Sequence, residues 1–259
     1  MYTNIYSEII RNFLIDDLQN IDIHIFDSID STNTYLKKIC NSTNGEFTTI
    51  IANEQTNGRG RLGRNFFSPA DTGIYMSFEI KPDMHISDAT FITTATSVAV
   101  CKAIENVTNL NPKIKWINDI YIDNKKVCGI LAEAVTDVNT GVLQSIIIGI
   151  GINVATSKDI FPDEIKDVAT SLNKDIDRNQ LIASILNHFY IIYNNSSATY
   201  MNEYKSRSLI IGKKIYYIKN GQNYYATALD FTDNGGLIVK NDNGTVETLT
   251  SGEISLRLI

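Results

Sequence analysis

Three arginines alternate with three glycines in the segment from Gln55 to Arg64, which has the sequence QTNGRGRLGR. Guanidinium groups bind phosphate and carboxylate oxygens through paired hydrogen bonds, and glycines let a loop approach a ligand closely. Arg59, Arg61 and Arg64 therefore predict a mobile loop that contacts a phosphate-bearing ligand. A basic loop that is merely solvated is the alternative that this motif alone leaves open.

The same loop contains a GxGxxG pattern at Gly58, Gly60 and Gly63, which would open a helix in a dinucleotide-binding fold. The residues that follow, 65–69, lack helical periodicity and end in proline, so this fold is rejected. A GxxxxGK[ST] sequence is also missing, which leaves a Walker-type nucleotide hydrolase unsupported.

A second group of chemical residues lies in the middle of the chain, where Lys126 precedes Gly129 in the strand-like segment KVCGILAE. The glycine allows a ligand to approach within a strand, and the ammonium group can meet a carboxylate or a phosphate. The KWIND segment that starts at Lys115 and the GIGIN segment that ends at Asn153 are weaker signals. Alone, each also fits a core tryptophan, a solvated lysine or an ordinary strand end.

Hydrophobic periodicity predicts the elements that would position these motifs. Helices are expected at residues 9–14, at 32–40 after Ser31 as N-cap, and at 87–107, 178–193 and 196–207. Strands are expected at 21–25, 48–53, 73–80, 113–116, 120–122, 126–135 and 142–150, with a hairpin turn at Asp123 and Asn124. The pattern indicates a mixed sheet, antiparallel in its later part, that helices cover.

From Gly212 onward the predicted elements are short strands, which are separated by turns rich in asparagine and glycine. This change predicts a small C-terminal β-barrel. We therefore expect an α+β protein with one domain at residues 1–211 and a second domain at residues 212–259.

Composition limits the classes of function. The net charge of −6 and the pI near 5.1 disfavour broad binding to nucleic acid or to an anionic membrane. Three widely spaced cysteines predict reduced thiols, and no leader or membrane-spanning pattern is present, so we expect a cytoplasmic protein. The three histidines form no metal-binding or triad spacing, and no metal site is predicted on the chain itself.

The motifs also occur together in one family. Ser31-Thr32-Asn33, GRGRLGR, KWIND, KKVCGIL, GIGIN and the terminal GEISLR stand in the same order as in biotin protein ligases. The chain resembles this family over nearly its whole length, and the set of motifs is highly specific. The resemblance implies a catalytic domain similar to class II aminoacyl-tRNA synthetases, followed by a small SH3-like barrel. It also implies activation of biotin with ATP to biotinyl-5′-AMP, and transfer of biotin to a lysine of a biotin carboxyl carrier protein domain.

The matching motifs imply roles for individual residues of this chain. The resemblance implies that Lys126, Arg59 and Arg61 are catalytic, because they would neutralise the carboxylate and the phosphates. It assigns biotin binding to Ser31, Thr32, Asn33, Gln55, Gly58, Arg59, Gly60, Arg61, Lys126, Gly129, Ile130 and Leu131. It assigns nucleotide binding to Arg61, Arg64, Phe66, Lys115, Asn118, Asn153 and Arg257.

Two positions depart from the family pattern. Ile117 stands where proline is usual in KWPND. Phe66 stands where tryptophan is usual after the loop that carries Arg59, Arg61 and Arg64, called the arginine loop below. Neither change removes a charged group, although phenylalanine would stack on adenine less strongly. The family mechanism further implies Mg²⁺ bound mainly through the ATP phosphates, and it allows a homodimer.

Three alternatives are weighed against this interpretation. A lipoate or octanoate protein ligase shares the fold and the acyl-adenylate chemistry, but the GRGRLGR and SGEISLR pair favours biotin. Some biotin ligases are also repressors with an N-terminal winged helix-turn-helix. Because only thirty residues precede Ser31 here, DNA binding is not expected. A biotin-binding module without catalysis is disfavoured by the presence of Lys126 and the arginines.

Overall fold

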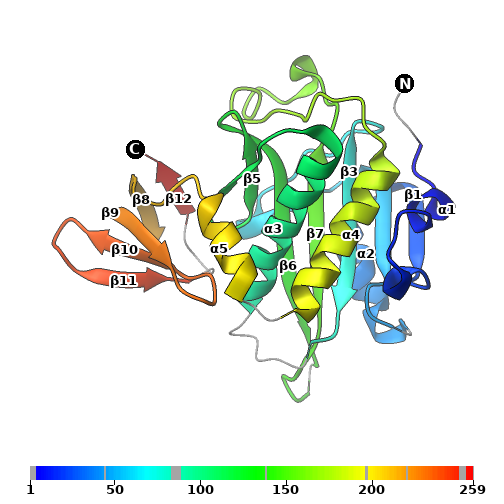
Figure 1. The fold of residues 1–259 in the computed structure, drawn as a ribbon, viewed down its shortest axis with the longest axis horizontal. Coiled ribbons are helices and arrows are strands. Elements are labelled where there is room, and N and C mark those ends of the chain that lie inside the picture. Colours follow the sequence, from blue (N-terminus) through cyan, green and yellow to red (C-terminus); the bar gives the residue numbers. More distant parts are fainter. Residues whose placement is uncertain are drawn as a thin grey trace.

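The computed structural model describes residues 4–43, 45–82, 89–137, 139–195, 198–219, 221–250 and 255–258. Its larger sheet has seven strands in the order β1-β2-β3-β7-β6-β5-β4 (Figure 1). The strands are β1 (Ile23–Ile29), β2 (Thr49–Gln55), β3 (Gly73–Ile80), β4 (Lys113–Lys115), β5 (Asp119–Ile122), β6 (Lys125–Thr136) and β7 (Leu143–Asn153). β1 pairs with β2 in parallel and the other neighbours are antiparallel, as the sequence predicts for its later part.

Helices cover both faces of this sheet. They are α1 (Ser7–Arg11), α2 (Thr32–Ile39), α3 (Ala89–Thr108), α4 (Arg178–Asn194) and α5 (Ala198–Ser206), with short 3₁₀ turns η1 (Asp16–Leu18), η2 (Cys40–Ser42), η3 (Arg61–Gly63) and η5 (Lys158–Ile160). α3 and α4 lie side by side over one face (Figure 1). α2 packs on β2, β3 and β7 on the opposite face, where Leu36 joins Ile147 in a small buried cluster.

α3 forms the centre of the main hydrophobic core. The apolar positions that predict this helix, Ile92, Ala95, Ala99 and Ala103, are all fully buried. They recur at helical spacing, so one face of the helix is continuously apolar against the sheet. Residues 87 and 88, where the helix was expected to begin, lie outside the described residues. No helix in the described part of the chain combines the length and the apolar character that crossing a bilayer requires.

The C-terminal part forms a second, antiparallel sheet in the order β11-β10-β9-β8-β12. Its strands are β8 (Lys214–Lys219), β9 (Gln222–Phe231), β10 (Leu237–Asn241), β11 (Val246–Leu249) and β12 (Ser255–Leu258). The Nε1 of Trp116 donates a hydrogen bond of 2.9 Å to the Gly235 carbonyl and so links the two sheets. Together the mixed sheet, its helices and this second sheet confirm the α+β class.

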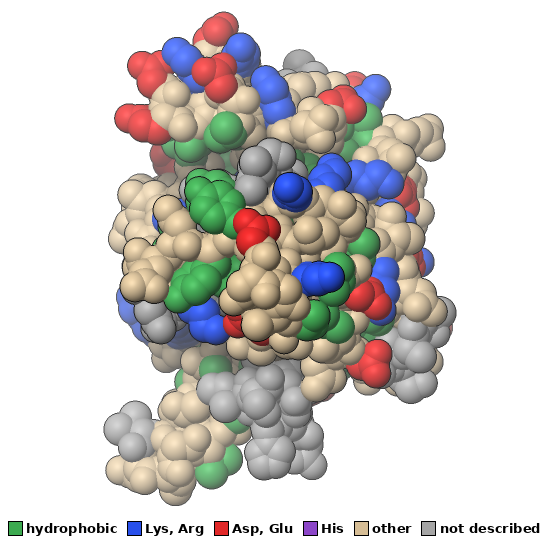
Figure 2. Space-filling view, turned by 90° about the vertical axis from the view of Figure 1, so that its left-hand side faces the viewer, with side chains coloured by type: hydrophobic (Ala, Val, Ile, Leu, Met, Phe, Trp, Pro, Cys, Tyr) green, Lys and Arg blue, Asp and Glu red, His purple; other side chains and the backbone are tan. Residues whose placement is uncertain are grey.

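The surface at this end carries charges of both signs. Figure 2 faces the end of the molecule that holds the second sheet, and it shows hydrophobic side chains in small separate groups. Exposed hydrophobic residues on these strands are Tyr224, Tyr225, Leu229 and Val246. Scattered apolar groups of this size are normal for a protein surface.

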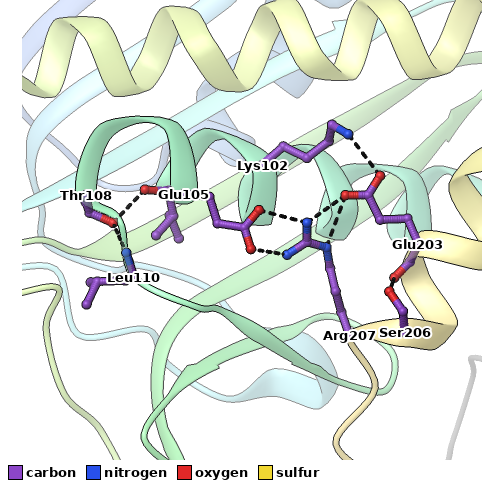
Figure 3. Close-up of polar contacts among 8 residues, drawn as sticks. Lys102, Glu105, Thr108, Leu110, Glu203, Ser206 and Arg207 are labelled. Atoms are coloured by element: carbon purple, nitrogen blue, oxygen red, sulfur yellow. Dashed lines mark hydrogen bonds and ion pairs between the residues drawn. The ribbon is translucent and has the colours of Figure 1, made fainter.

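A cluster of charged residues fastens α3 to the end of α5. Arg207 lies 2.5 and 2.8 Å from the two carboxylate oxygens of Glu105 and 2.6 Å from Glu203, and Lys102 also reaches Glu203 at 2.9 Å (Figure 3). The hydrogen bonds from Arg207 to Glu105 hold the pKa of Arg207 above its usual value in spite of burial. The Arg207 side chain is only 12% exposed.

Replacement of this arginine is expected to destabilise the protein. Arg207→Met would leave Glu105 and Glu203 close together without their shared cation, which should lower the free energy of unfolding by about 2–3 kcal/mol. Urea denaturation measures the change. The control is Lys205→Met, which breaks a more exposed ion pair with Asp230 and should cost less than about 1 kcal/mol. Equal losses in both variants would contradict the special role of Arg207.

Glu247 gives the second sheet a dependence on pH. Its carboxylate accepts hydrogen bonds from Tyr217 at 2.5 Å and Asn241 at 2.8 Å, and it pairs with Lys219 at 2.9 Å. These contacts, with that of Tyr217 the largest, lower the pKa of Glu247 from 4.5 to about 2.

Because the pKa is lower in the folded state, the stabilisation by Glu247 is complete above about pH 4.5 and is lost as the pH falls toward 2. Glu247→Gln should therefore make the free energy of unfolding fall less steeply with decreasing pH in this window. Urea denaturation at a series of pH values measures the slope. Glu164→Gln, at an exposed loop position, removes the same charge and should keep the wild-type slope.

Candidate active site

A cavity of about 470 Å³ lies on the sheet face that α2 covers. Its walls come from the start of α2, the end of β2, the arginine loop and the strands β3, β6 and β7. Its lining residues are Ser31, Thr32, Asn33, Gln55, Arg59, Gly60, Arg61, Phe66, Met76, Asn118, Lys126, Gly129, Ile130, Leu131, Gly149, Ile150 and Gly151. Thirteen of the sequence-predicted site residues are therefore gathered around one cavity, although they are up to a hundred positions apart in sequence.

Glycines make the floor of the cavity. In β6 and β7, Gly129 pairs with Gly151 and Leu131 pairs with Gly149, so three glycines share the face that points toward α2. A Cβ atom at Gly149 would overlap the Asn33 side chain, and one at Gly151 would overlap the ring of Phe66. The hollow therefore requires glycine at both positions of β7.

The polar end of the cavity is built on the first turn of α2. The Ser31 hydroxyl accepts a long hydrogen bond of 3.5 Å from the Thr34 backbone N–H, which confirms Ser31 as the N-cap. The Oε1 of Gln55 accepts from the backbone N–H of Thr32 at 3.0 Å and from its hydroxyl at 3.1 Å. Thr32 and Asn33 are both 3% exposed, so the structure holds their polar atoms in fixed directions.

The arginine loop folds back on itself beside this end. The Gly60 N–H donates to the Arg64 carbonyl at 2.7 Å, and residues Arg59 and Asn65 form an antiparallel bridge. Arg61 donates to Oδ1 of Asn118 at 3.1 Å. Burial lowers the pKa of Arg61, and the negative charge of Asp119 acts in the opposite direction. A guanidinium remains charged at neutral pH, so Arg61 brings a half-buried positive charge to the cavity.

Lys126 supplies a second positive charge near the glycine floor. Its Nζ lies 2.6 Å from Oδ1 of Asp119 on the neighbouring strand, and a Cβ atom added at Gly129 would lie 3.2 Å from it. The backbone of Lys126 is fixed by hydrogen bonds to Val168 at 2.9 Å and from Thr170 at 2.8 Å. An anionic ligand that enters the cavity can therefore replace or share the contact with Asp119.

Glu133 joins the loop to α2. It forms ion pairs with Lys37 at 2.5 Å and with Arg59 at 3.2 Å, and it accepts a hydrogen bond from Asn33 at 2.9 Å. Burial alone would raise the pKa of Glu133, but the hydrogen bonds from Asn33 and Lys37 and the two positive charges outweigh it and leave the pKa lowered. The carboxylate is therefore ionised at neutral pH.

Five predicted site residues do not line this cavity. The Gly58 carbonyl accepts a hydrogen bond of 2.9 Å from the Phe66 N–H, and Arg64 is an exposed residue of the loop. Lys115 lies 5.7 Å from the ring centre of Tyr121. Asn153 is buried at the end of β7, where its amide donates to the Thr170 carbonyl at 3.1 Å. The side chain of Arg257 lies outside the part of the chain that the structure describes.

Two further hollows adjoin the cavity. One, of about 1380 Å³, shares Gln55 and Phe66 with it and extends toward Pro162 and Ile165. The other, of about 580 Å³, lies beyond Arg61 and is bordered by Thr93 of α3. Because the ring of Phe66 and the side chain of Arg61 border two hollows each, both can contact a ligand that is longer than the first cavity.

Four lining residues were not predicted from the sequence: Met76, Gly149, Ile150 and Gly151. The signal was present in β7, because glycine alternates with isoleucine in GIGI and alternation places both glycines on one face of a strand. The arrangement combines hydrogen-bond acceptors at one end with Arg59, Arg61 and Lys126 around the rest. Such a cavity suits a ligand with a polar ring at one end and an anionic group at the other.

Family models match two parts of the chain. Residues 25–153 match the biotin/lipoate A/B protein ligase family, and residues 210–257 match the biotin protein ligase C terminal domain. The first region contains all of the cavity-lining residues, and the second contains nearly all of the C-terminal sheet.

Comparisons over most of the chain agree with these two family matches. The chain is 33% identical to the bifunctional ligase/repressor BirA of Bacillus spizizenii, over 89% of this chain and 72% of that protein. It is 28% identical to the biotin--[acetyl-CoA-carboxylase] ligase of Mycobacterium tuberculosis, over 80% of this chain and 79% of the relative. The structure of biotin protein ligase from Aquifex aeolicus in complex with biotin and ATP superposes with a TM-score of 0.79 at 28% identity, covering 92% of this chain and 99% of the other. The chain therefore belongs to the biotin protein ligase family.

Proposed function

We propose that this protein activates biotin with ATP to form biotinyl-5′-AMP and then transfers biotin to a lysine of a biotin carboxyl carrier protein domain. One observation carries the proposal: a single cavity joins a hydrogen-bonding end at Thr32 and Asn33 to the cations Arg61 and Lys126. The two ends of biotin match the two ends of the cavity, because its ureido ring is polar and neutral and its tail ends in a carboxylate.

In the first step an oxygen of the biotin carboxylate attacks the α-phosphorus of ATP, and the bond to the β-phosphate oxygen breaks to release pyrophosphate. Carboxylate and phosphate repel each other, so the main task of the protein is to hold both and to neutralise their charge. We assign this task to Lys126 and Arg61, whose charged groups border the cavity, and to Arg59 on the adjoining loop.

In the second step the neutral amine of the carrier lysine attacks the carbonyl carbon of biotinyl-5′-AMP, and AMP leaves with its phosphate oxygen. The nitrogen loses a proton to complete the amide. The arginine loop would exclude water from the mixed anhydride until the amine arrives. Arg64, Phe66, Lys115, Asn118, Asn153 and Arg257 remain our proposed nucleotide contacts, and Gly58 and Gly60 would give the loop its close approach.

Mg²⁺ fits this site mainly as a partner of ATP. Among the residues that the structure describes, no group of three His, Cys, Asp or Glu side chains gathers as a metal site, and Asp119 already pairs with Lys126. Phosphate oxygens would therefore supply most ligands, and the ion would reduce the negative charge that an attacking carboxylate meets.

The carrier partner and the cellular location are parts of the same proposal. The Mycobacterium tuberculosis relative is named for acetyl-CoA-carboxylase, which supports a carrier domain of a biotin-dependent carboxylase as the acceptor. All three cysteines are free and buried, which supports a reducing compartment, the cytoplasm. β1 lies at an edge of the large sheet, which supports a homodimer formed by edge pairing.

Pyrophosphate release from ATP, measured with biotin, lipoate or octanoate as the sole acid, tests the proposal. We expect release with biotin only, followed by labelling of a purified carrier domain. Release with only lipoate or octanoate would assign the protein to the sister activity. Biotin binding without release would indicate a non-catalytic module.

A further inference from the structure

We propose that Glu133 is a positioning residue that sets the hydrogen-bond polarity of the ring end of the cavity. Its carboxylate holds the NH₂ group of Asn33 away from the ligand, so that the amide oxygen faces the N–H donors of the substrate ring. The inference rests on the proposed function, since it concerns how the same site recognises biotin.

The environment of Glu133 uses both of its oxygens. Oε1 pairs with Lys37 at 2.5 Å and with Arg59 at 3.2 Å, and Oε2 accepts from Nδ2 of Asn33 at 2.9 Å. The side chain is only 16% exposed. A carboxylate has no donor, so Asn33 can meet it only with its NH₂ group.

The orientation of Asn33 follows from this contact. Its Nδ2 also donates to the Leu131 carbonyl at 3.2 Å, and its Oδ1 lies over Gly149 within reach of the Ser77 hydroxyl at 2.5 Å. The shorter contact, and the only charged one, is with Glu133. Gly149 and Asn33 both line the cavity, and the amide oxygen is the Asn33 atom nearest to the position that a Cβ atom at Gly149 would occupy.

The neighbouring hydroxyls leave an acceptor for the ligand. The Ser77 hydroxyl has one proton, and two acceptors are near it: Oδ1 of Asn33 at 2.5 Å and Oγ1 of Thr32 at 2.7 Å. Thr32 gives its own proton to Gln55 at 3.1 Å. One of the two buried oxygens therefore retains hydrogen-bonding capacity, which a cyclic urea such as biotin can fill with a ring N–H.

Glu133→Gln changes this polarity while it preserves shape. Lys37 and Arg59 would compete for the single remaining oxygen, and the new NH₂ group would then face the NH₂ group of Asn33. We expect the dissociation constant of biotin, measured by calorimetry without ATP, to rise about 10- to 100-fold. The kcat for pyrophosphate release at saturating biotin should change less than the affinity, because Lys126 and Arg61 keep their contacts with Asp119 and Asn118 and only Arg59 loses a carboxylate partner.

A double-mutant cycle with Asn33→Asp tests direct partnership. Asn33→Asp alone would place two carboxylates in contact, whereas in the double variant the amide at 133 could donate to the aspartate at 33. The loss of biotin affinity in the double variant should be at least about tenfold smaller than the product of the two single losses. Single losses that simply multiply would overturn the proposal.

Lys37→Gln is the matched control, because it removes another partner of Glu133 and leaves the carboxylate to accept from Asn33. Its biotin affinity should remain within about threefold of wild type. An equal loss in Lys37→Gln, or an unchanged affinity in folded Glu133→Gln, would overturn the inference and leave the proposed function standing. Failure of the wild type to bind biotin would overturn both, so the two failures are distinguishable.

Discussion

Lys126→Ala is expected to lower kcat/KM for biotin-dependent pyrophosphate release about 10²- to 10³-fold. The ammonium group lies at the junction of the glycine floor and Asp119, where a carboxylate and a phosphate would meet. Its removal leaves the developing charge of the reaction without a fixed counter-charge in a partly buried site. Single-turnover measurement of biotinyl-5′-AMP formation gives the rate directly.

Lys125→Ala is the control for this experiment. Lys125 is the adjacent residue of β6, so its side chain points to the opposite face of the strand. The control should keep wild-type kinetics, since it removes the same charge outside the cavity. Comparable losses in the two variants would show that net charge and not the position of Lys126 matters.

Gly149→Ala is expected to weaken biotin binding about 100-fold. The added Cβ atom would overlap Asn33, which cannot retreat without breaking its hydrogen bonds to Leu131 and Glu133. Overpacking of a closely packed site typically costs about 1–3 kcal/mol. Here the displaced Asn33 side chain would reduce the free energy of biotin binding. Calorimetry with biotin alone measures the dissociation constant.

The control substitution is Gly45→Ala, in a loop where an added Cβ would meet no atom within 4 Å. Biotin affinity should be unchanged in this variant. If Gly149→Ala bound biotin as tightly as wild type, the floor of the cavity would have to lie elsewhere.

Local sequence signals account for much of the fold. The N-cap at Ser31, the apolar face of α3 and the turn at Asp123 and Asn124, both with positive φ, are features of a few adjacent residues. Each depends on helix periodicity or turn chemistry and not on the rest of the chain. The domain boundary at Gly212 stays a prediction.

The site required more than local signals. Periodicity could not show that Gly149 and Gly151 pair with Leu131 and Gly129, because strand register is decided by contacts across the whole sheet. The end of β7 was expected at residue 150, but pairing with β3 continues the strand to Asn153.

The same limit applies to the charges around the cavity. Glu133 contacts Arg59 and Asn33 from positions 74 and 100 residues away, and nothing in the local sequence indicates that these side chains meet. The family motifs identified Arg59 and Asn33, and the structure shows that Glu133 contacts both of them.

Trp116 is the only tryptophan of the protein, and it lies in the turn between β4 and β5, where its hydrogen bond reaches the C-terminal part of the chain. Trp116 is 6% exposed and its indole N–H donates to the carbonyl of Gly235, in the turn between β9 and β10, while Asn118, two residues later, is in the wall of the cavity. Indole fluorescence responds to hydrogen bonding and to water. The fluorescence of this single tryptophan should therefore change both when the two sheets separate and when a ligand fills the cavity. No second tryptophan contributes to the signal.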